Sequence, residues 1–370
     1  LFVFMGNVVS ATGMGEDAYD VANQAFRKIR GGLAIGTVGA NAVFAAITGI
    51  SIASAAVFTK IAVPHMIKFG YSPRFSVGVV AGSSVLGMLI PPSLLLILYG
   101  ILTEQSIGDL FIAAIIPGIL LAMVFGFGIL LLSFFWPSFV HSKKENSKPD
   151  LQLMKLREFL QKGAPLVILI VVVLGGIYGG FFTPIEAGAI GSFGAVLIGL
   201  IKRRLSLATL WEVLVETGYI TAAISFLIIA AQMYARMLAL SGMPSEFGSF
   251  VVSSEFSIMS MILLYILLVI LMGTILDSGS IMLILVPLMY PILVTLNIDL
   301  IWFGIVTVIA VEVGLLTPPL GISVFVIKSS LDDKSITLGD IFIGAFPFAI
   351  MMIAVLFLVL AFPQLTTFLL

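Results

Sequence analysis

The sequence predicts an all-α polytopic membrane protein built on an inverted-topology repeat, with two re-entrant helical hairpins and two broken transmembrane helices. Three observations support this fold class: an apolar composition, basic residues confined to alternate loops, and two proline-containing segments that repeat 227 residues apart. Of the 370 residues, 60% are hydrophobic and 10% are charged, whereas soluble domains carry about 25% charged residues. Because one crossing takes roughly 20 apolar residues, this length allows about ten crossings with short loops.

Charge and cysteine content exclude several classes of function. The formal net charge is −1 and no basic stripe with interleaved aromatic residues is present, so nucleic-acid binding is not expected. The chain has no cysteine, which excludes disulfides, thiolate metal sites and cysteine nucleophiles. The two histidines, His65 and His141, lie far apart without acidic neighbours at ligand spacing, so both are expected to be loop or interfacial residues.

The first region, residues 1–30, is expected to hold a partial N-terminal helix and an amphipathic connector. Because the chain begins at Leu1 inside an apolar run, and not at a methionine, the start of this part is expected to be missing. The next two apolar pieces, 31–47 and 55–67, are too short to span, and basic residues flank both outer ends. A re-entrant hairpin that enters and leaves by one face accounts for both features.

The segment 75–103 is apolar enough to cross a bilayer, but the stretch GSSVLGMLIPPS at residues 82–93 interrupts it. Pro91 and Pro92 lack an N–H and clash with the preceding turn, so backbone carbonyls near residues 87–89 are expected to lose their helical partners. Unpaired carbonyls are costly in hydrocarbon. Na⁺ is a suitable partner for such oxygens and for nearby hydroxyls, and the N-terminus of the following half-helix offers N–H groups to an anion.

Basic residues orient the remaining segments. The loop 141–162 carries six Lys or Arg residues and is therefore assigned to the cytoplasm by the positive-inside rule. The segments that complete the map are apolar runs at 109–136, 163–182, 185–201, 217–235 and 340–361, a second hairpin at 257–296 and a broken segment at 301–327. The second hairpin opens toward the face opposite the first. Of the 18 Lys and Arg residues, this map places only Arg236 outside.

The hairpins and broken segments repeat in matching frames. Pro91 and Pro318 are 227 residues apart, and the same offset relates Gly87 to Gly314. GMLIPPS and GLLTPPL are therefore equivalent pieces of an inverted-topology repeat, an arrangement typical of secondary transporters. One proline pair alone would indicate little, since kinked membrane helices are common. Two pairs in matching frames predict two sites.

Small and hydroxyl-bearing residues gather at each hairpin tip and helix break. Such residues are also enriched where membrane helices pack, and packing is the alternative explanation for each of them taken singly. Paired prolines at matched positions favour binding sites, because packing does not require them. The candidate substrate-binding residues in these clusters are Ser51, Ser54, Ser93, Asp277 and Ser278.

Ionisable residues at membrane depth are functional candidates because they are costly there. Asp277, at the second tip, is the foremost of them. Glu312 is either a functional acid or a structural acid that hydrogen-bonds unwound backbone, whereas Glu186, shortly after Pro184, is expected to cap a helix. Arg236 either snorkels to the headgroups or turns inward to bind the substrate carboxylate or Asp277.

Five stretches of the chain carry a family resemblance: ITGISIASAAV, AGSSVLGMLIPPSLLLILYG, GGFFTPIEAGAIG, MGTILDSGSIMLILVPLMYP and VEVGLLTPPLGISVFVIK. In order and spacing they resemble the large membrane subunit of tripartite ATP-independent periplasmic (TRAP) transporters, along essentially the whole chain. The resemblance implies an elevator-type, multi-pass transporter of the bacterial inner membrane that is driven by Na⁺. Na⁺ would be the coupling ion, and neither another cofactor nor an enzymatic activity is implied.

The resemblance also implies partners, substrates and ion ligands. The partners would be a small membrane subunit of about four helices and a periplasmic substrate-binding protein, and the substrates carboxylates such as C4-dicarboxylates or sialic acid. In that family the cations lie at the hairpin tips and the facing helix breaks. Carried over by position, the ligands are Gly49, Ser51, Ser83 and Gly87 for one cation site, and Thr274, Gly314, Thr317 and Pro318 for the other.

Other functions fit the sequence less well. The nearest alternative is a binding-protein-independent Na⁺/dicarboxylate or related anion carrier of the same architecture. An intramembrane aspartyl protease would need two carboxylates that share a proton, and Asp277 has no partner in a matching motif. A channel would not need inverted hairpins. The predicted regions are 1–30 (partial helix and connector), 31–103 (first transport repeat), 104–256 (scaffold and arm helices with the cytoplasmic loop 141–162), 257–328 (second transport repeat) and 329–370 (C-terminal scaffold helix).

Overall fold

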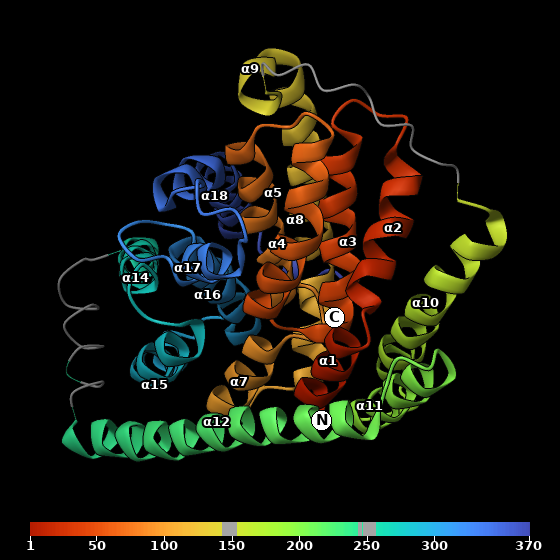
Figure 1. The fold of residues 1–370 in the computed structure, drawn as a ribbon. Coiled ribbons are helices and arrows are strands. Elements are labelled where there is room, and N and C mark those ends of the chain that lie inside the picture. Colours follow the sequence, from red (N-terminus) through yellow and green to blue (C-terminus); the bar gives the residue numbers. More distant parts are fainter. Residues whose placement is uncertain (143–153, 243–245, 247–256) are drawn as a thin grey trace.

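The computed structural model describes residues 1–142, 154–242, 246 and 257–370, and its regular structure is helical (Figure 1). Seven helical segments among these residues are long and apolar enough to cross a membrane. The predicted all-α polytopic fold class is therefore confirmed. Residues 143–153 of the predicted cytoplasmic loop lie outside the described part of the chain.

Two helices, α1 (Phe2–Ala11) and α2 (Met14–Phe26), precede the first hairpin. α1 packs on α11 (Pro184–Ile201), whereas α2 packs chiefly on α3 (Gly32–Thr48). The α2–α3 contact is close, because a Cβ added to Gly36 would lie 2.3 Å from Oδ1 of Asn23. α2 thus connects the N-terminal helix to the first hairpin along that hairpin's side.

The first hairpin pairs α3 with α4 (Ser51–Lys68), and only Gly49 and Ile50 join them. The expectation that the second arm begins near residue 55 is wrong. Gly49 adopts a left-handed conformation, with φ of 65°, which ends α3 and reverses the chain at once. The following Ile50 is extended, so α4 can begin at Ser51 and place that serine at the tip.

The first broken helix consists of α5 (Pro73–Ser84), α6 (Leu86–Leu89) and α7 (Leu94–Thr103). Its interruption at residues 90–93 confirms the break predicted from the proline pair. Pro91 and Pro92 are both buried, and the peptide bond between them is cis.

The middle of the chain comprises α8 (Ile107–Phe135), α9 (Pro137–Val140), α10 (Leu156–Tyr178), α11 and α12 (Leu207–Ser241). α10 begins within the stretch 141–162 that was expected to be loop. The charged residues there hid its first turns from a hydropathy argument, although the Glu158–Lys162 ion pair of 3.2 Å has the i,i+4 spacing that supports a helix. In Figure 1, α12 lies across the lower end of α1 and α7, roughly perpendicular to α5 and α8.

The second half repeats the order of the first. Two helices, α14 (Ile258–Gly273) and α15 (Ser278–Thr295), form the second pair, and α16 (Leu300–Leu315) and α17 (Ile322–Ser330) form the second broken helix. The Pro318–Pro319 bond in this break is also cis. α18 (Leu338–Ala361) and α19 (Gln364–Thr367) end the chain. The re-entrant placement of both pairs in the membrane stays a prediction.

The core lies where the two halves meet. Every residue of α16 from Trp302 to Leu315 is buried, and α5 and α18 touch backbone to backbone at Gly78 and Gly344. In contrast, α12 exposes large apolar side chains around its circumference, among them Trp211 (68% exposed). Such a surface suits contact with lipid or with another membrane helix.

Candidate functional site

Each hairpin tip lies against the break of the broken helix in its own repeat. In the first repeat the Leu94 N–H donates to the Gly49 carbonyl at 3.2 Å. Gly87 lies so close to the same tip that an added Cβ would be 2.9 Å from the Ser51 nitrogen. Only glycine permits this approach without moving the backbone.

The second repeat has the same relationship. The Thr274 carbonyl accepts hydrogen bonds from Leu320 N–H at 3.1 Å and Gly321 N–H at 3.0 Å, which lie just beyond the break. A Cβ added to Gly314 would lie 2.6 Å from the Gly273 Cα. Both predicted pairings of tip and break are therefore present, at equivalent positions of the two halves.

The two breaks differ in exposure. Gly87, Pro91 and Ser93 of the first break are buried, whereas Thr317 is half-buried and Pro318 is exposed. The second break therefore offers its oxygens to an aqueous path or a partner, and the first break does not.

Ser93 bridges the first break. Its hydroxyl donates to the Met88 carbonyl and accepts from the Leu96 N–H at 3.3 Å, which caps α7. The expectation that the Met88 carbonyl lacks a protein partner is wrong. The extended conformation of Ser93 lets its side chain reach back across the gap that the prolines leave.

A polar contact joins the two repeats at the first tip. The Ser51 hydroxyl donates to Oε1 of Glu312, in α16, at 3.3 Å. Ser51, Ser54 and Glu312 are all nearly inaccessible, with exposed fractions of 0%, 0% and 1%. Within the described residues, Oε2 of Glu312 and the Ser54 hydroxyl have no hydrogen-bond partner. Buried polar atoms are rarely left unpaired, so these oxygens form a candidate ligand site.

Glu312 itself was expected to be either a functional acid or an acid that hydrogen-bonds unwound backbone. Its hydrogen bond among the described residues goes to a side chain of the opposite repeat. The structural interpretation in terms of unwound backbone is therefore wrong. A carboxylate at this depth needs a proton, a cation or a hydrogen-bonding partner to offset its desolvation.

Ser83 has a partner that the sequence argument missed. Nδ2 of Asn41, in α3, donates to the Ser83 hydroxyl at 2.7 Å, and Ser83 donates to the Val79 carbonyl at 2.6 Å. Asn41 is fully buried, and its Oδ1 has no hydrogen-bond partner among the described residues. A lone asparagine within an apolar helix is a costly residue, and that cost was the signal in the sequence.

The second tip is held by helix capping. Asp277 accepts hydrogen bonds from the Ser280 N–H at 3.0 Å and from the Ser280 hydroxyl, so it caps α15. Ser278 next to it is buried. The hydroxyls of Thr274 and Thr317 donate to carbonyls one helical turn earlier, at 2.8 Å and 2.7 Å. Both threonine oxygens still have lone pairs with which to accept or to bind a cation.

The remaining ionisable candidates lie apart from this centre. Arg236 is exposed on α12, and it forms no ion pair with Asp277, although the structure describes both residues. Glu186 caps α11 through a reciprocal pair of hydrogen bonds with Thr183, which confirms the capping expectation.

Comparison with known proteins identifies relatives along the whole chain. Residues 1–365 match the family described as "Tripartite ATP-independent periplasmic transporter, DctM component". The C4-dicarboxylate TRAP transporter large permease protein DctM of Pseudomonas aeruginosa is 33% identical over 98% of this chain and 83% of its own length. The isethionate TRAP transporter permease protein DctMQ of Oleidesulfovibrio alaskensis is 29% identical over 99% of this chain and 56% of its own length.

Among solved structures, the crystal structure of the Alcanivorax borkumensis YdaH transporter is similar in fold. The TM-score is 0.66 at 14% sequence identity, and the match covers 98% of this chain and 85% of that one. At this identity the likeness concerns the arrangement of helices alone.

Proposed function

The chain belongs to the DctM component family of tripartite ATP-independent periplasmic transporters, and from that premise we propose that it performs Na⁺-coupled secondary active uptake of an organic acid. It is a multi-pass membrane protein of a transporter family. In the proposal it lies in the bacterial inner membrane. A small membrane subunit of about four helices accompanies it, and a periplasmic binding protein delivers the substrate.

The observation that carries the proposal is the twofold pairing of hairpin tip and helix break. Broken helices near the membrane midplane leave backbone groups and helix ends free to bind ions and anionic substrates. Here each break faces a tip through a backbone hydrogen bond, at Gly49 in one repeat and at Thr274 in the other. Two such sites related by an inverted repeat fit alternating access better than an open pore. We propose that the tip–break units move together past the scaffold helices, as an elevator.

For the coupling ions we propose the two oxygen-rich centres. Hard cations prefer carbonyl, hydroxyl and carboxylate oxygens. The first cation would use Gly49, Ser51, Ser83 and Gly87, to which the proximity of Glu312 adds a carboxylate. The ligands proposed for the second cation are Thr274, Gly314, Thr317 and Pro318.

For the substrate we propose the space between the tips, with Ser51, Ser54, Ser93, Asp277 and Ser278 near it and Arg236 as an outer attraction. The N-terminus of α15 begins at Ser278, and helix N-termini suit anions. Since Asp277 is a carboxylate, its capping role favours orientation of that N-terminus over direct contact with an acid.

The relatives suggest two substrate classes. One relative is named for C4-dicarboxylates and the other for isethionate, a sulfonate. We propose a carboxylate, because the more identical relative carries one, and we keep a small sulfonate as the second candidate. Uptake of radiolabelled succinate, with unlabelled isethionate as competitor, separates them.

The experiment uses proteoliposomes that hold this chain with its small membrane subunit. Uptake should require the cognate periplasmic binding protein, and purified binding protein should retain the same acid. Equal uptake without the binding protein would favour the alternative, a binding-protein-independent carrier of the same architecture.

A further inference from the structure

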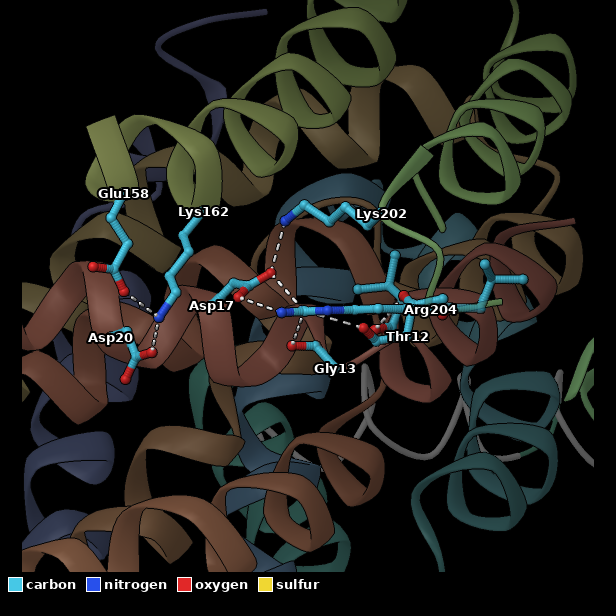
Figure 2. Close-up of polar contacts among 10 residues, drawn as sticks. Thr12, Gly13, Asp17, Asp20, Glu158, Lys162, Lys202 and Arg204 are labelled. Atoms are coloured by element: carbon cyan, nitrogen blue, oxygen red, sulfur yellow. Dashed lines mark hydrogen bonds and ion pairs between the residues drawn. The ribbon is translucent and has the colours of Figure 1, made fainter. Parts of the chain in front are cut away.

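A second polar site lies far from the hairpin tips, between α2, α10 and α11. It surrounds a cavity of about 580 Å³, a size within the range of ligand pockets. Figure 2 shows its charged side chains in two neighbouring groups, one around Lys162 and one around Asp17. Neither group has a place in the proposed transport cycle.

The group around Asp17 has an excess of positive charge. Oδ2 of Asp17 accepts from the Lys202 ammonium at 2.7 Å and from the Arg204 guanidinium at 2.9 Å. The Asp17 side chain is 2% exposed, whereas those of Lys202 and Arg204 are 17% and 39% exposed. One carboxylate thus meets two cations, which leaves one positive charge uncompensated on the accessible side.

The neighbouring group has the opposite excess. The Lys162 ammonium lies 2.7 Å from Oδ2 of Asp20 and 3.2 Å from Oε1 of Glu158. Two carboxylates share one cation, which leaves one negative charge. Glu158 is half exposed, at 51%, so its carboxylate faces an approaching ligand. The two groups together present a positive pole beside a negative pole.

The wall of the cavity continues from these charges into an apolar surface. Pro165 and Ile168 of α10 and Ile198 and Ile201 of α11 line it. Both helices are apolar enough to span the membrane. Charged groups at the end of spanning helices, next to exposed apolar side chains, match the boundary between lipid headgroups and acyl chains.

We propose that this cavity binds one phosphatidylethanolamine molecule of the surrounding bilayer. The lipid phosphate lies against Lys202 and Arg204, its ammonium against Glu158 and Asp20, and an acyl chain along Ile168 and Ile201. An anionic lipid offers nothing to the negative pole. Phosphatidylcholine carries a positive charge there but has no N–H with which to donate to a carboxylate.

Native mass spectrometry of the complex with the small membrane subunit tests this proposal. The complex is titrated at low lipid concentration with an equimolar mixture of phosphatidylethanolamine, phosphatidylglycerol and phosphatidylcholine of distinct masses. We expect the first bound lipid to be phosphatidylethanolamine, with a Kd about threefold to tenfold lower than those of the other two. Equal Kd values for the three lipids would overturn the proposal.

Two variants and two matched controls locate the site. Lys202→Gln should weaken phosphatidylethanolamine binding about threefold or more, and Glu158→Gln should remove the preference over phosphatidylcholine. The controls are Lys155→Gln and Glu212→Gln, which alter exposed charges that do not line the cavity. If Lys202→Gln fails to fold, the half-exposed Glu158 still decides the question. Equal effects in variants and controls would refute the site, as would lipid binding that is lost when the small subunit is present.

Discussion

The Ser51 hydroxyl, at the tip of the first hairpin, donates a 3.3 Å hydrogen bond to the buried Glu312 carboxylate of the opposite repeat. This contact is the one place where a side chain of one tip meets an ionisable group of the other half. It makes Glu312 a ligand candidate that a two-site scheme based on tips and breaks does not contain. Movement of either repeat against the other would have to preserve or break it.

Glu312→Gln tests that contact. Glutamine keeps the length of the side chain and an oxygen for Ser51 but removes the charge. Because hydrogen bonds and contacts to charged groups are the stronger ones, we expect the Na⁺ concentration for half-maximal uptake to rise about tenfold. Glu216→Gln, at an exposed position of α12, is the control. An unchanged Na⁺ requirement in Glu312→Gln would remove Glu312 from the cation site.

Alanine at Gly87 or Gly314 tests the close approach of tip and break. The new Cβ would meet backbone atoms at 2.9 Å and 2.6 Å, so one segment must shift. Overpacking of this kind costs about 1–3 kcal/mol, and we expect a lower Tm in detergent together with loss of uptake. Gly218→Ala in α12 meets nothing within 4 Å and should stabilise its helix by about 0.5–1 kcal/mol. Full uptake by Gly87→Ala would show that the approach is not required.

Several features of this site follow from the sequence because they are local. Proline and glycine act on the backbone within a turn, so the breaks at Pro91 and Pro318 and the hairpin at Gly49 could be predicted. The 227-residue repeat then related the two halves. In the same way, Pro184 and Glu186 predicted a helix cap that the structure confirms.

Other features depend on packing between distant elements, which no local pattern encodes. Ser51 and Glu312 are 261 residues apart, and Asn41 and Ser83 are 42 apart. The start of α10 was missed for a different reason, since its first turns lie outside the apolar run and are supported by an ion pair between Glu158 and Lys162. Hydropathy finds the buried part of such a helix and not its charged end.

Arg236 separates a substrate role from a headgroup contact. If its guanidinium attracts the substrate anion, Arg236→Lys should lose most uptake, because an ammonium does not reproduce bidentate carboxylate binding. If it only snorkels to headgroups, lysine should serve equally well. Uptake rates at saturating and limiting substrate distinguish these outcomes, with Arg157→Lys as the exposed control. Full activity of both Arg236→Lys and Arg236→Gln would reject a substrate role.

The membrane orientation can be tested by cysteine labelling, because the chain has no natural cysteine. Ser257 precedes α14 and Ser335 precedes α18, and both are exposed. We expect Ser257→Cys to react with a membrane-impermeant maleimide in intact spheroplasts, and Ser335→Cys to react only after permeabilisation. The reverse pattern would invert the orientation derived from the basic loops.

The central claim is Na⁺ coupling, and uptake in proteoliposomes under imposed ion gradients tests it most directly. Vesicles hold this chain with its small membrane subunit, and the binding protein and labelled acid are added outside. We expect uptake to require an inward Na⁺ gradient and to accelerate with an inside-negative potential, since one net charge moved across 100 mV contributes about 2.3 kcal/mol. Thr317→Ala should need more Na⁺ for the same rate. Undiminished uptake on a proton gradient, with all Na⁺ replaced by choline, would contradict the account.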